Sequence, residues 1–168
     1  MLNSIKKDFK IFENYISLNC ELEVSNYITH EESKEYGACS FILNNQTIQF
    51  RVSKITPTKT GQFVTIWKRN ALGNTEPFHE LDNLDFVIIS CRRDDSLGQF
   101  IFPKQVLIAQ GIISTANKMG KRGIRVYPPW DITENKQATK TQKWQLYYFL
   151  NMSTENQTHI NFAKQILT

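Results

Sequence analysis

The stretch CSFILNNQTIQFRVSK, which runs from Cys39 to Lys54, says most about the architecture of this chain. Apolar residues fill Cys39–Leu43, two asparagines follow, and apolar and polar residues then alternate. Adjacent asparagines tolerate the left-handed backbone of a tight hairpin turn. We therefore predict two antiparallel strands, with Phe50 on a buried face and Arg51 on the opposite, exposed polar face.

The remaining elements predict a mixed α+β fold. An apolar stripe at helical spacing predicts a helix over Ser4–Asn19, with Ser4 as its N-cap. We expect further strands at Gln62–Lys68, Asp85–Cys91, Gln99–Phe102 and Ile124–Tyr127, and further helices at Pro103–Gln110, Asn135–Asn151 and Ser153–Leu167. Nothing in the composition divides residues 1–168. We predict one domain, with a central mixed or antiparallel sheet of five or six strands flanked by N- and C-terminal helices.

The composition is typical of a globular protein without a membrane anchor. Hydrophobic residues make up 40% of the 168 residues, but no run is long and apolar enough to span a bilayer. The N-terminus lacks the apolar stretch of a signal peptide. Three scattered cysteines, Cys20, Cys39 and Cys91, are neither a disulfide framework nor a zinc motif. We expect free thiols and a cytoplasmic location.

Positive charge is concentrated in the later part of the chain. Residues 1–50 hold four lysines against seven acids, and the remainder holds sixteen basic residues against nine acids. The segments Arg51–Arg69 and Ser96–Trp130 each contain five basic residues and no acid. Such an asymmetry is typical of a protein that meets a polyanion, and it favours nucleic acid as the partner.

Two of the basic segments lie on or beside predicted strands. The first contributes cations among threonine hydroxyls, and both kinds of group donate hydrogen bonds to phosphate oxygens; its cations are Arg51, Lys54, Lys59, Lys68 and Arg69. The alternative is a solvated sheet edge that lysines protect from aggregation. The second segment contributes Lys121, Arg122 and Arg125, followed by the rings of Tyr127 and Trp130.

An exposed ring beside arginines can stack on a base, which is how single strands are commonly held. The alternative for Trp130 is that it closes the core behind a proline bend. A third segment places Lys140 and Lys143 on one stripe of a helix, a pattern that is usually a solvated face. Together the three segments predict a basic, aromatic-lined groove that binds nucleic acid with little sequence preference, single-stranded DNA or RNA among the candidates.

Catalytic motifs are missing, and we assign no catalytic residue, metal site or cofactor. The sequence has no phosphate-binding glycine loop, nucleophile elbow or metal-spaced histidines. A nuclease dependent on Mg²⁺ or Mn²⁺ remains an alternative, because Asp82 and Asp85 can each supply a carboxylate. The strand on which a nuclease core would carry that carboxylate reads Gln49-Phe50-Arg51 instead.

Several strings resemble the MepB family in sequence and in order; they are FRVSKITPTKTGQFVTIWKR (50–69), GQFIFPK (98–104), RVYPPWD (125–131) and KTQKWQ (140–145). The resemblance implies a small bacterial cytoplasmic protein encoded with a multidrug efflux pump and its repressor. It implies no activity. It adds a further alternative, a regulatory or drug-binding module with an aromatic pocket drawn from Trp67, Trp130 and Trp144.

Overall fold

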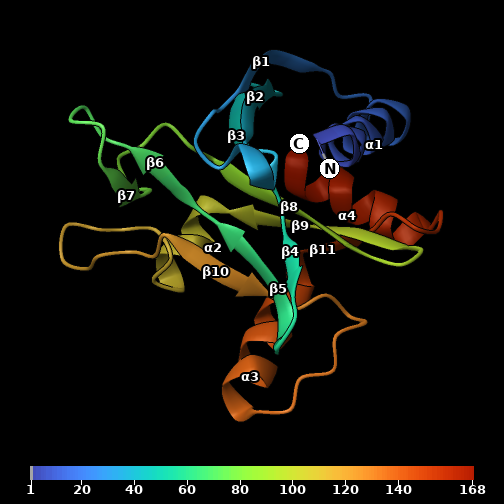
Figure 1. Cartoon of the computed structure of the whole chain (residues 1–168). Helices are drawn as coiled ribbons and strands as arrows, with labels where there is room; N and C mark the ends of the chain where they lie inside the picture. Colours follow the sequence, from blue (N-terminus) through green and yellow to red (C-terminus); the bar gives the residue numbers. More distant parts are fainter. Residues whose placement is uncertain (1) are drawn as a thin grey trace.

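The computed structural model describes residues 2–168, with the side chains from Lys6 onward. It is one α+β domain with a six-stranded mixed sheet and helices at both ends of the chain, as predicted (Figure 1). The strands, in spatial order, are β1 (Val24–Thr29), β2 (Cys39–Leu43), β3 (Gln46–Val52), β8 (Phe86–Arg93), β9 (Ser96–Pro103) and β11 (Phe149–Asn151). Neighbouring strands are antiparallel except β3 and β8, which are parallel.

The predicted hairpin is confirmed. Cys39 of β2 pairs with Phe50 of β3, and the turn residues Asn44 and Asn45 have φ angles of 49° and 62°. Both angles lie in the left-handed region that this type of two-residue turn requires. The hairpin therefore follows from local turn chemistry and from the alternation of its strands.

One face of the main sheet is covered by α1 (Leu2–Cys20) and α4 (Gln157–Leu167) (Figure 1). Phe12 of α1 is fully buried and packs with Phe41 and Phe50 of the hairpin. The predicted N-terminal helix is confirmed. Its expected N-cap, Ser4, lies outside the described side chains.

The chain leaves the main sheet at Ser53 and enters a second sheet. The Ser53 N–H donates to the carbonyl of Ser90, and its hydroxyl donates to Gln62 Oε1 at 2.8 Å. The second sheet contains β10 (Gly123–Val126), β5 (Lys59–Thr65) and β4 (Lys54–Thr56), in that spatial order. Its inner residues Val64 and Val126 are buried in the core that lies on this side of the main sheet.

Short elements complete this layer. They are α2 (Lys104–Ala109), α3 (Lys136–Gln145), the hairpin of β6 (Trp67–Arg69) and β7 (Thr75–Pro77), and the 3-10 turns η1 (Lys34–Tyr36) and η2 (Leu146–Tyr148). All three cysteines are free and buried, as expected. From residue 2 onward, no helix is long and apolar enough to cross a membrane.

The predicted helix Asn135–Asn151 is wrong in its second half. The helix ends at Gln145, and Phe149 starts the edge strand β11. The Phe149 ring lies over Gly98 of β9, where an added Cβ would be 2.1 Å from it. Cross-strand packing of this aromatic residue on a glycine thus replaces the last turn of the helix. Strand β1 was not predicted.

Candidate nucleic-acid interface

The outward face of the second sheet carries both rings and cations. Arg125 of β10 and Lys54 of β4 both have Phe63 of β5 as their register partner. Because side chains directly opposite each other in a ladder share a face, these three residues project from the same side. The opposite side of the sheet is the buried core, so this face points away from the body of the domain.

Two aromatic rings lie on this face above glycines of the neighbouring strand. An added Cβ at Gly61 would be 2.6 Å from the Tyr127 ring, and one at Gly123 would be 2.6 Å from the Phe63 ring. Gly61 also has a φ of +83°, which disfavours any side chain. Both rings are half-buried, and Tyr36 packs edge-on against Phe63 at 6.2 Å between centroids. We call Tyr36, Phe63, Arg125 and Tyr127 the basic–aromatic face.

Arg125 is held on this face by oxygen atoms that carry no charge. Its Nη2 donates to the Thr56 hydroxyl at 2.8 Å, and its Nη1 donates to the carbonyl of Gly61 at 3.2 Å. No carboxylate of the described residues forms an ion pair with it. The guanidinium is therefore fixed in position but keeps its positive charge unpaired.

Helix α3 is fastened to the free edge of β10 by the buried side chain of Gln145. Its Oε1 accepts from the Tyr127 N–H at 2.8 Å, and its Nε2 donates to the Arg125 carbonyl at 2.9 Å. One turn earlier, Gln142 Nε2 donates to the carbonyls of Pro128 and Asp131. These two glutamines hold the strand that carries the cation and the ring of the face.

A cleft of about 310 Å³ lies between β10, α3 and the end of α2. We call it the α3 cleft. Its lining includes two basic residues, an indole, several amides and, among the described residues, no acid; the lining residues are Gln110, Ile112, Lys121, Gly123, Ile124, Arg125, Tyr127, Asn135, Gln137, Ala138, Thr141, Trp144 and Gln145. Arg125 and Tyr127 belong both to this cleft and to the basic–aromatic face, so the two surfaces are continuous.

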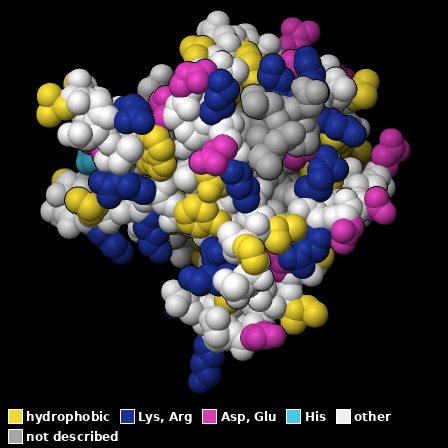
Figure 2. Space-filling model, viewed as in Figure 1, with side chains coloured by type: hydrophobic (Ala, Val, Ile, Leu, Met, Phe, Trp, Pro, Cys, Tyr) yellow, Lys and Arg dark blue, Asp and Glu magenta, His cyan; other side chains and the backbone are white. Residues whose placement is uncertain are grey.

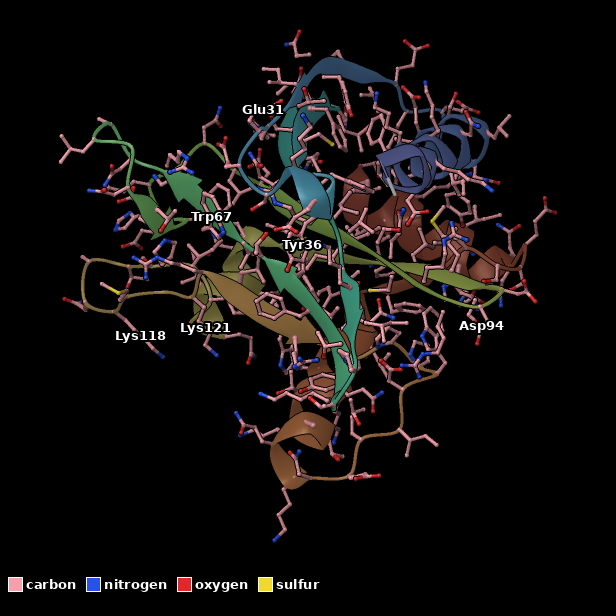
Figure 3. All side chains as sticks on the ribbon, in the orientation of Figure 1. Glu31, Tyr36, Trp67, Asp94, Lys118 and Lys121 are labelled. Atoms are coloured by element: carbon pink, nitrogen blue, oxygen red, sulfur yellow. The ribbon has the colours of Figure 1, made fainter. Side chains whose placement is uncertain are left out.

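Most of the other predicted cations surround these two surfaces. Lys59, Lys121, Arg122, Lys140 and Lys143 are exposed, and none has an ion pair with a described residue. The helix turns about 100° per residue, so the lysines of α3 flank the cleft and do not line it. Figure 2 shows dark blue side chains across the lower left of this view, where little magenta appears. Figure 3 places Lys121 near the start of β10.

Three predicted cations lie at the margin of this surface, and two of them are already paired. Lys54 forms an ion pair with Glu35 at 2.9 Å and lies 4.3 Å from the Tyr36 ring centroid. Lys68 contacts two carboxylates, of which Asp82 is at 2.6 Å. Arg69 is exposed on β6, where it donates to a backbone carbonyl and lies over Trp67.

The expectation that Arg51 lies on an exposed face is wrong. Its side chain is only 2% exposed, and its Nη1 donates to the Phe50 carbonyl at 2.9 Å and to Gln49 Oε1 at 3.3 Å. Burial lowers the pKa of Arg51 to about 10. The polar side of β3 was predicted correctly, but the second layer of the domain covers it, so Arg51 cannot reach a phosphate in this conformation.

Trp130 follows the alternative interpretation, in which it closes the core. Its ring packs edge-on against Phe149 at 5.7 Å, and its indole N–H is buried with no partner among the described residues. The three tryptophans do not form a shared pocket around the α3 cleft, since Trp144 alone of them lines it. Trp144 also contacts the core ring of Phe102.

The carboxylates of the nuclease alternative have structural contacts. Asp85 accepts from the Thr47 N–H at 2.8 Å, and Asp82 accepts from the His79 N–H and from Lys68. Within residues 2–168, no three His, Cys, Asp or Glu residues are grouped closely enough to hold a metal ion.

Comparison with known proteins gives a family for this chain. The MepB-like family model matches residues 30–151. The chain belongs to the MepB-like family. A solved structure described as the crystal structure of MepB is 36% identical, with a TM-score of 0.76, and the match covers 79% of this chain and 89% of that one. No match was found among curated proteins.

The part that matches the MepB-like family includes the whole interface. Residues 30–151 extend from η1 to β11 and therefore contain β5, β10 and α3, whereas α1 and α4 lie outside the match. The glutamines of α3 were not predicted as site residues. Their spacing could have indicated a shared role. Gln142 and Gln145 are three residues apart, so they lie on the same side of a lysine-rich helix, the side that faces the sheet.

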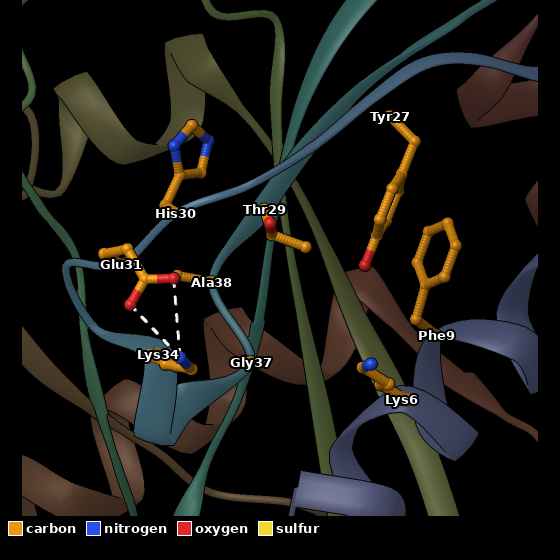
Figure 4. Close-up of a pocket in the computed structure, with 9 residues that line it drawn as sticks. All are labelled: Lys6, Phe9, Tyr27, Thr29, His30, Glu31, Lys34, Gly37 and Ala38. Carbon is orange, nitrogen blue, oxygen red and sulfur yellow. Dashed lines mark hydrogen bonds and ion pairs between the residues drawn. The ribbon is translucent and has the colours of Figure 1, made fainter.

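A second cavity, of about 280 Å³, lies between the start of α1, β1 and η1 (Figure 4). Phe9 and Tyr27 supply its rings, and Lys6 and Lys34 line it as well. Its acid, Glu31, already forms an ion pair with Lys34 at 3.1 Å. The lining thus offers no unpaired negative charge to a cationic drug, and we assign no ligand to this cavity.

Proposed function

We propose that the protein binds nucleic acid, with little dependence on sequence, through the basic–aromatic face and the α3 cleft. One observation carries the proposal. Unpaired cations from β5, β10, α3 and the segment before β10 surround half-buried rings on one continuous surface. These cations have no carboxylate partner among the described residues, so they are available to an anionic partner.

The cations suit a phosphate backbone because each is exposed or fixed without a carboxylate partner. Lys59 lies at one end of the outward face, Arg125 at its centre, and Lys121 at the mouth of the cleft. Lys140 and Lys143 extend the positive surface along α3. Neutralising phosphates releases counterions from the nucleic acid, which is the main source of sequence-independent affinity.

The rings favour a single strand over a duplex. Phe63 and Tyr127 are only half-buried on an open sheet face, where unstacked bases can reach them. Stacking of a base on an aromatic ring contributes about 1–3 kcal/mol and accepts every base. Rings that alternate with cations therefore support a sequence-tolerant complex with single-stranded DNA or RNA.

The test is a salt titration of affinity for a fluorescently labelled single strand, followed by anisotropy. For single strands, each neutralised phosphate contributes about −0.7 to the slope of log affinity against log salt. If four cations engage, we expect a slope of about −3. Arg125→Gln should weaken binding and bring the slope about 0.7 closer to zero.

The matched control is Lys164→Gln, because Lys164 is an exposed cation on α4, on the other side of the main sheet. It removes the same charge from the molecule and should leave affinity and slope nearly unchanged. A flat salt response by the unmodified protein would contradict the proposal. So would equal losses from the two variants, because binding would then depend on net charge and not on this surface.

A further inference from the structure

The α3 cleft opens on backbone groups of β10 that the sheet leaves unused. The Ile66 N–H donates to the Arg122 carbonyl at 2.8 Å, which fixes the pattern of bonds between β5 and β10. In an antiparallel pair, alternate residues turn their N–H and C=O groups away from the partner strand. Gly123 and Arg125 are those residues, so their backbone groups point toward the free edge, where the cleft lies.

Gln145 occupies only one end of this edge. It takes the Arg125 carbonyl and the Tyr127 N–H. No hydrogen bond from another described residue reaches the Gly123 N–H, the Gly123 C=O or the Arg125 N–H. Gly123 therefore offers an N–H donor and a C=O acceptor side by side. The edge of a nucleobase carries an acceptor and a donor that can pair with them.

The side chains around this edge supply the rest of a nucleotide site. Lys121 supplies the positive charge of the lining and Trp144 its indole. Arg125 also lines the cleft, but its guanidinium is held over β5 and β4, away from this edge. Gln137 and Gln110 are exposed amides with no described side-chain hydrogen bond, so both can turn toward a ligand. No acid lines the cleft, so nothing there repels a phosphate.

The size of the cleft fits one small ligand. A volume of about 310 Å³ lies at the lower end of the range for small-molecule sites, about 300–1,000 Å³. A duplex cannot enter, because its bases are stacked and their edges are paired. A single nucleotide that has left the stack can place its base at the strand edge and its phosphate near Lys121.

We propose that the α3 cleft binds one unpaired nucleotide, with its base at the free edge of β10 and its phosphate at Lys121. The inference rests on the nucleic-acid function proposed above and adds that one nucleotide of the bound strand is singled out. An extended peptide could also pair with a free strand edge. The positive charge of Lys121 and the absence of acids among the described lining residues favour the nucleotide.

The first experiment uses the ¹⁵N-labelled full chain and titrates it separately with 5′-nucleoside monophosphates, inorganic phosphate, an unphosphorylated nucleoside and a short extended peptide. We expect at least one monophosphate to bind about tenfold more tightly than phosphate or the nucleoside alone, with shifts at the amides of Gly123 and Arg125. Equal affinity for inorganic phosphate would overturn the inference, because the base would then contribute nothing. Shifts caused by the peptide and not by the monophosphates would overturn it as well.

The second experiment compares variants of the cleft. Thr141→Phe fills the cleft from α3 and leaves every cation in place, and we expect it to weaken monophosphate binding about tenfold. Gln137→Ala should weaken it less and change the preference among bases. Gln105→Ala is the matched control, since Gln105 is exposed on α2 outside the cleft. Urea midpoints of all three variants show whether each remains folded.

The two proposals fail differently. If the strand binds with a steep salt slope but no monophosphate binds, the inference about the cleft is wrong and the proposed function stands. If the strand does not bind, the proposed function is wrong, whatever the monophosphates do. Unchanged monophosphate affinity in folded Thr141→Phe would place the ligand outside the cleft and overturn the inference.

Discussion

Replacing Gln145 by leucine tests how α3 holds β10 in place. The substitution keeps a side chain of similar size but removes both bonds of 2.8 and 2.9 Å, to the Tyr127 N–H and the Arg125 carbonyl. A buried backbone group left without a partner costs about 1–3 kcal/mol. Because the α3 cleft admits water to this edge, we expect the lower end of that range, about 1–1.5 kcal/mol, for each group. The free energy of unfolding should fall by about 2–3 kcal/mol in total.

Urea unfolding measures this loss. With a slope of about 2 kcal/mol per molar urea, Gln145→Leu should lower the midpoint by about 1–1.5 M and leave the slope unchanged. Gln137→Leu is the control, because Gln137 is exposed on the same helix, and its effect should stay within about 0.5 kcal/mol. A midpoint within about 0.25 M of the unmodified protein for Gln145→Leu would refute the reasoning, since the two bonds would then contribute almost nothing.

Three further outcomes follow from ionisable groups that are buried or half-buried. Arg51→Met should leave the free energy of unfolding unchanged or raise it by about 1 kcal/mol, because the buried guanidinium has no ion pair with a described residue and its Nε has no partner among them. A urea midpoint corresponding to a loss above about 2 kcal/mol would contradict this. Burial raises the pKa of Cys39 to about 11 and also raises that of Cys91. Both thiols should therefore resist a thiol reagent at about pH 8 until denaturant is added. Rapid modification of these two cysteines in the native protein would argue against this. Burial, and then the charge of Arg51, lower the pKa of His30 below its ordinary value of 6.5. The stability that neutral His30 contributes should therefore be lost as pH falls below about 6.5. Urea midpoints with the same pH dependence in His30→Gln as in the unmodified protein would contradict this.

The sequence was sufficient for the parts of the fold that local chemistry determines. The Asn44-Asn45 turn and the alternation around it predict the first hairpin, since both signals act between neighbouring residues. The acid-free segment that ends at Trp130 was predicted to carry binding cations, and it supplies the basic residues of β10 and of the cleft. Their gathering with α3 was a hypothesis from charge alone, and the structure brings Lys121, Arg125 and Tyr127 together at one cleft.

Arg51 shows what an alternating pattern leaves open. The alternation of apolar and polar residues predicts on which side of a strand each residue lies, but it does not predict what covers that side. Here one side meets α1 and α4, and the other meets the second layer of the domain, so the polar position is buried as fully as the apolar ones. The covering layer comes from residues far along the chain, and no local signal reports it.

The end of α3 and the role of Gln145 depend equally on distant partners. Phe149 leaves the helical pattern because Gly98, fifty-one residues earlier, gives its ring a place on β9. Gln145 becomes part of the site because the edge of β10 has unpaired groups opposite it. In a helix, glutamine is otherwise an ordinary surface residue, so its type alone does not mark it.

The most direct test of the central claim locates the bound strand on the protein. Amide chemical shifts of the ¹⁵N-labelled chain are followed while a short single-stranded oligonucleotide is added at low salt. We predict that the largest changes fall on β5, β10 and α3, at residues such as Phe63, Arg125 and Thr141. Changes confined to α1 and α4, on the other side of the main sheet, would contradict the claim that these cations and rings form the binding surface.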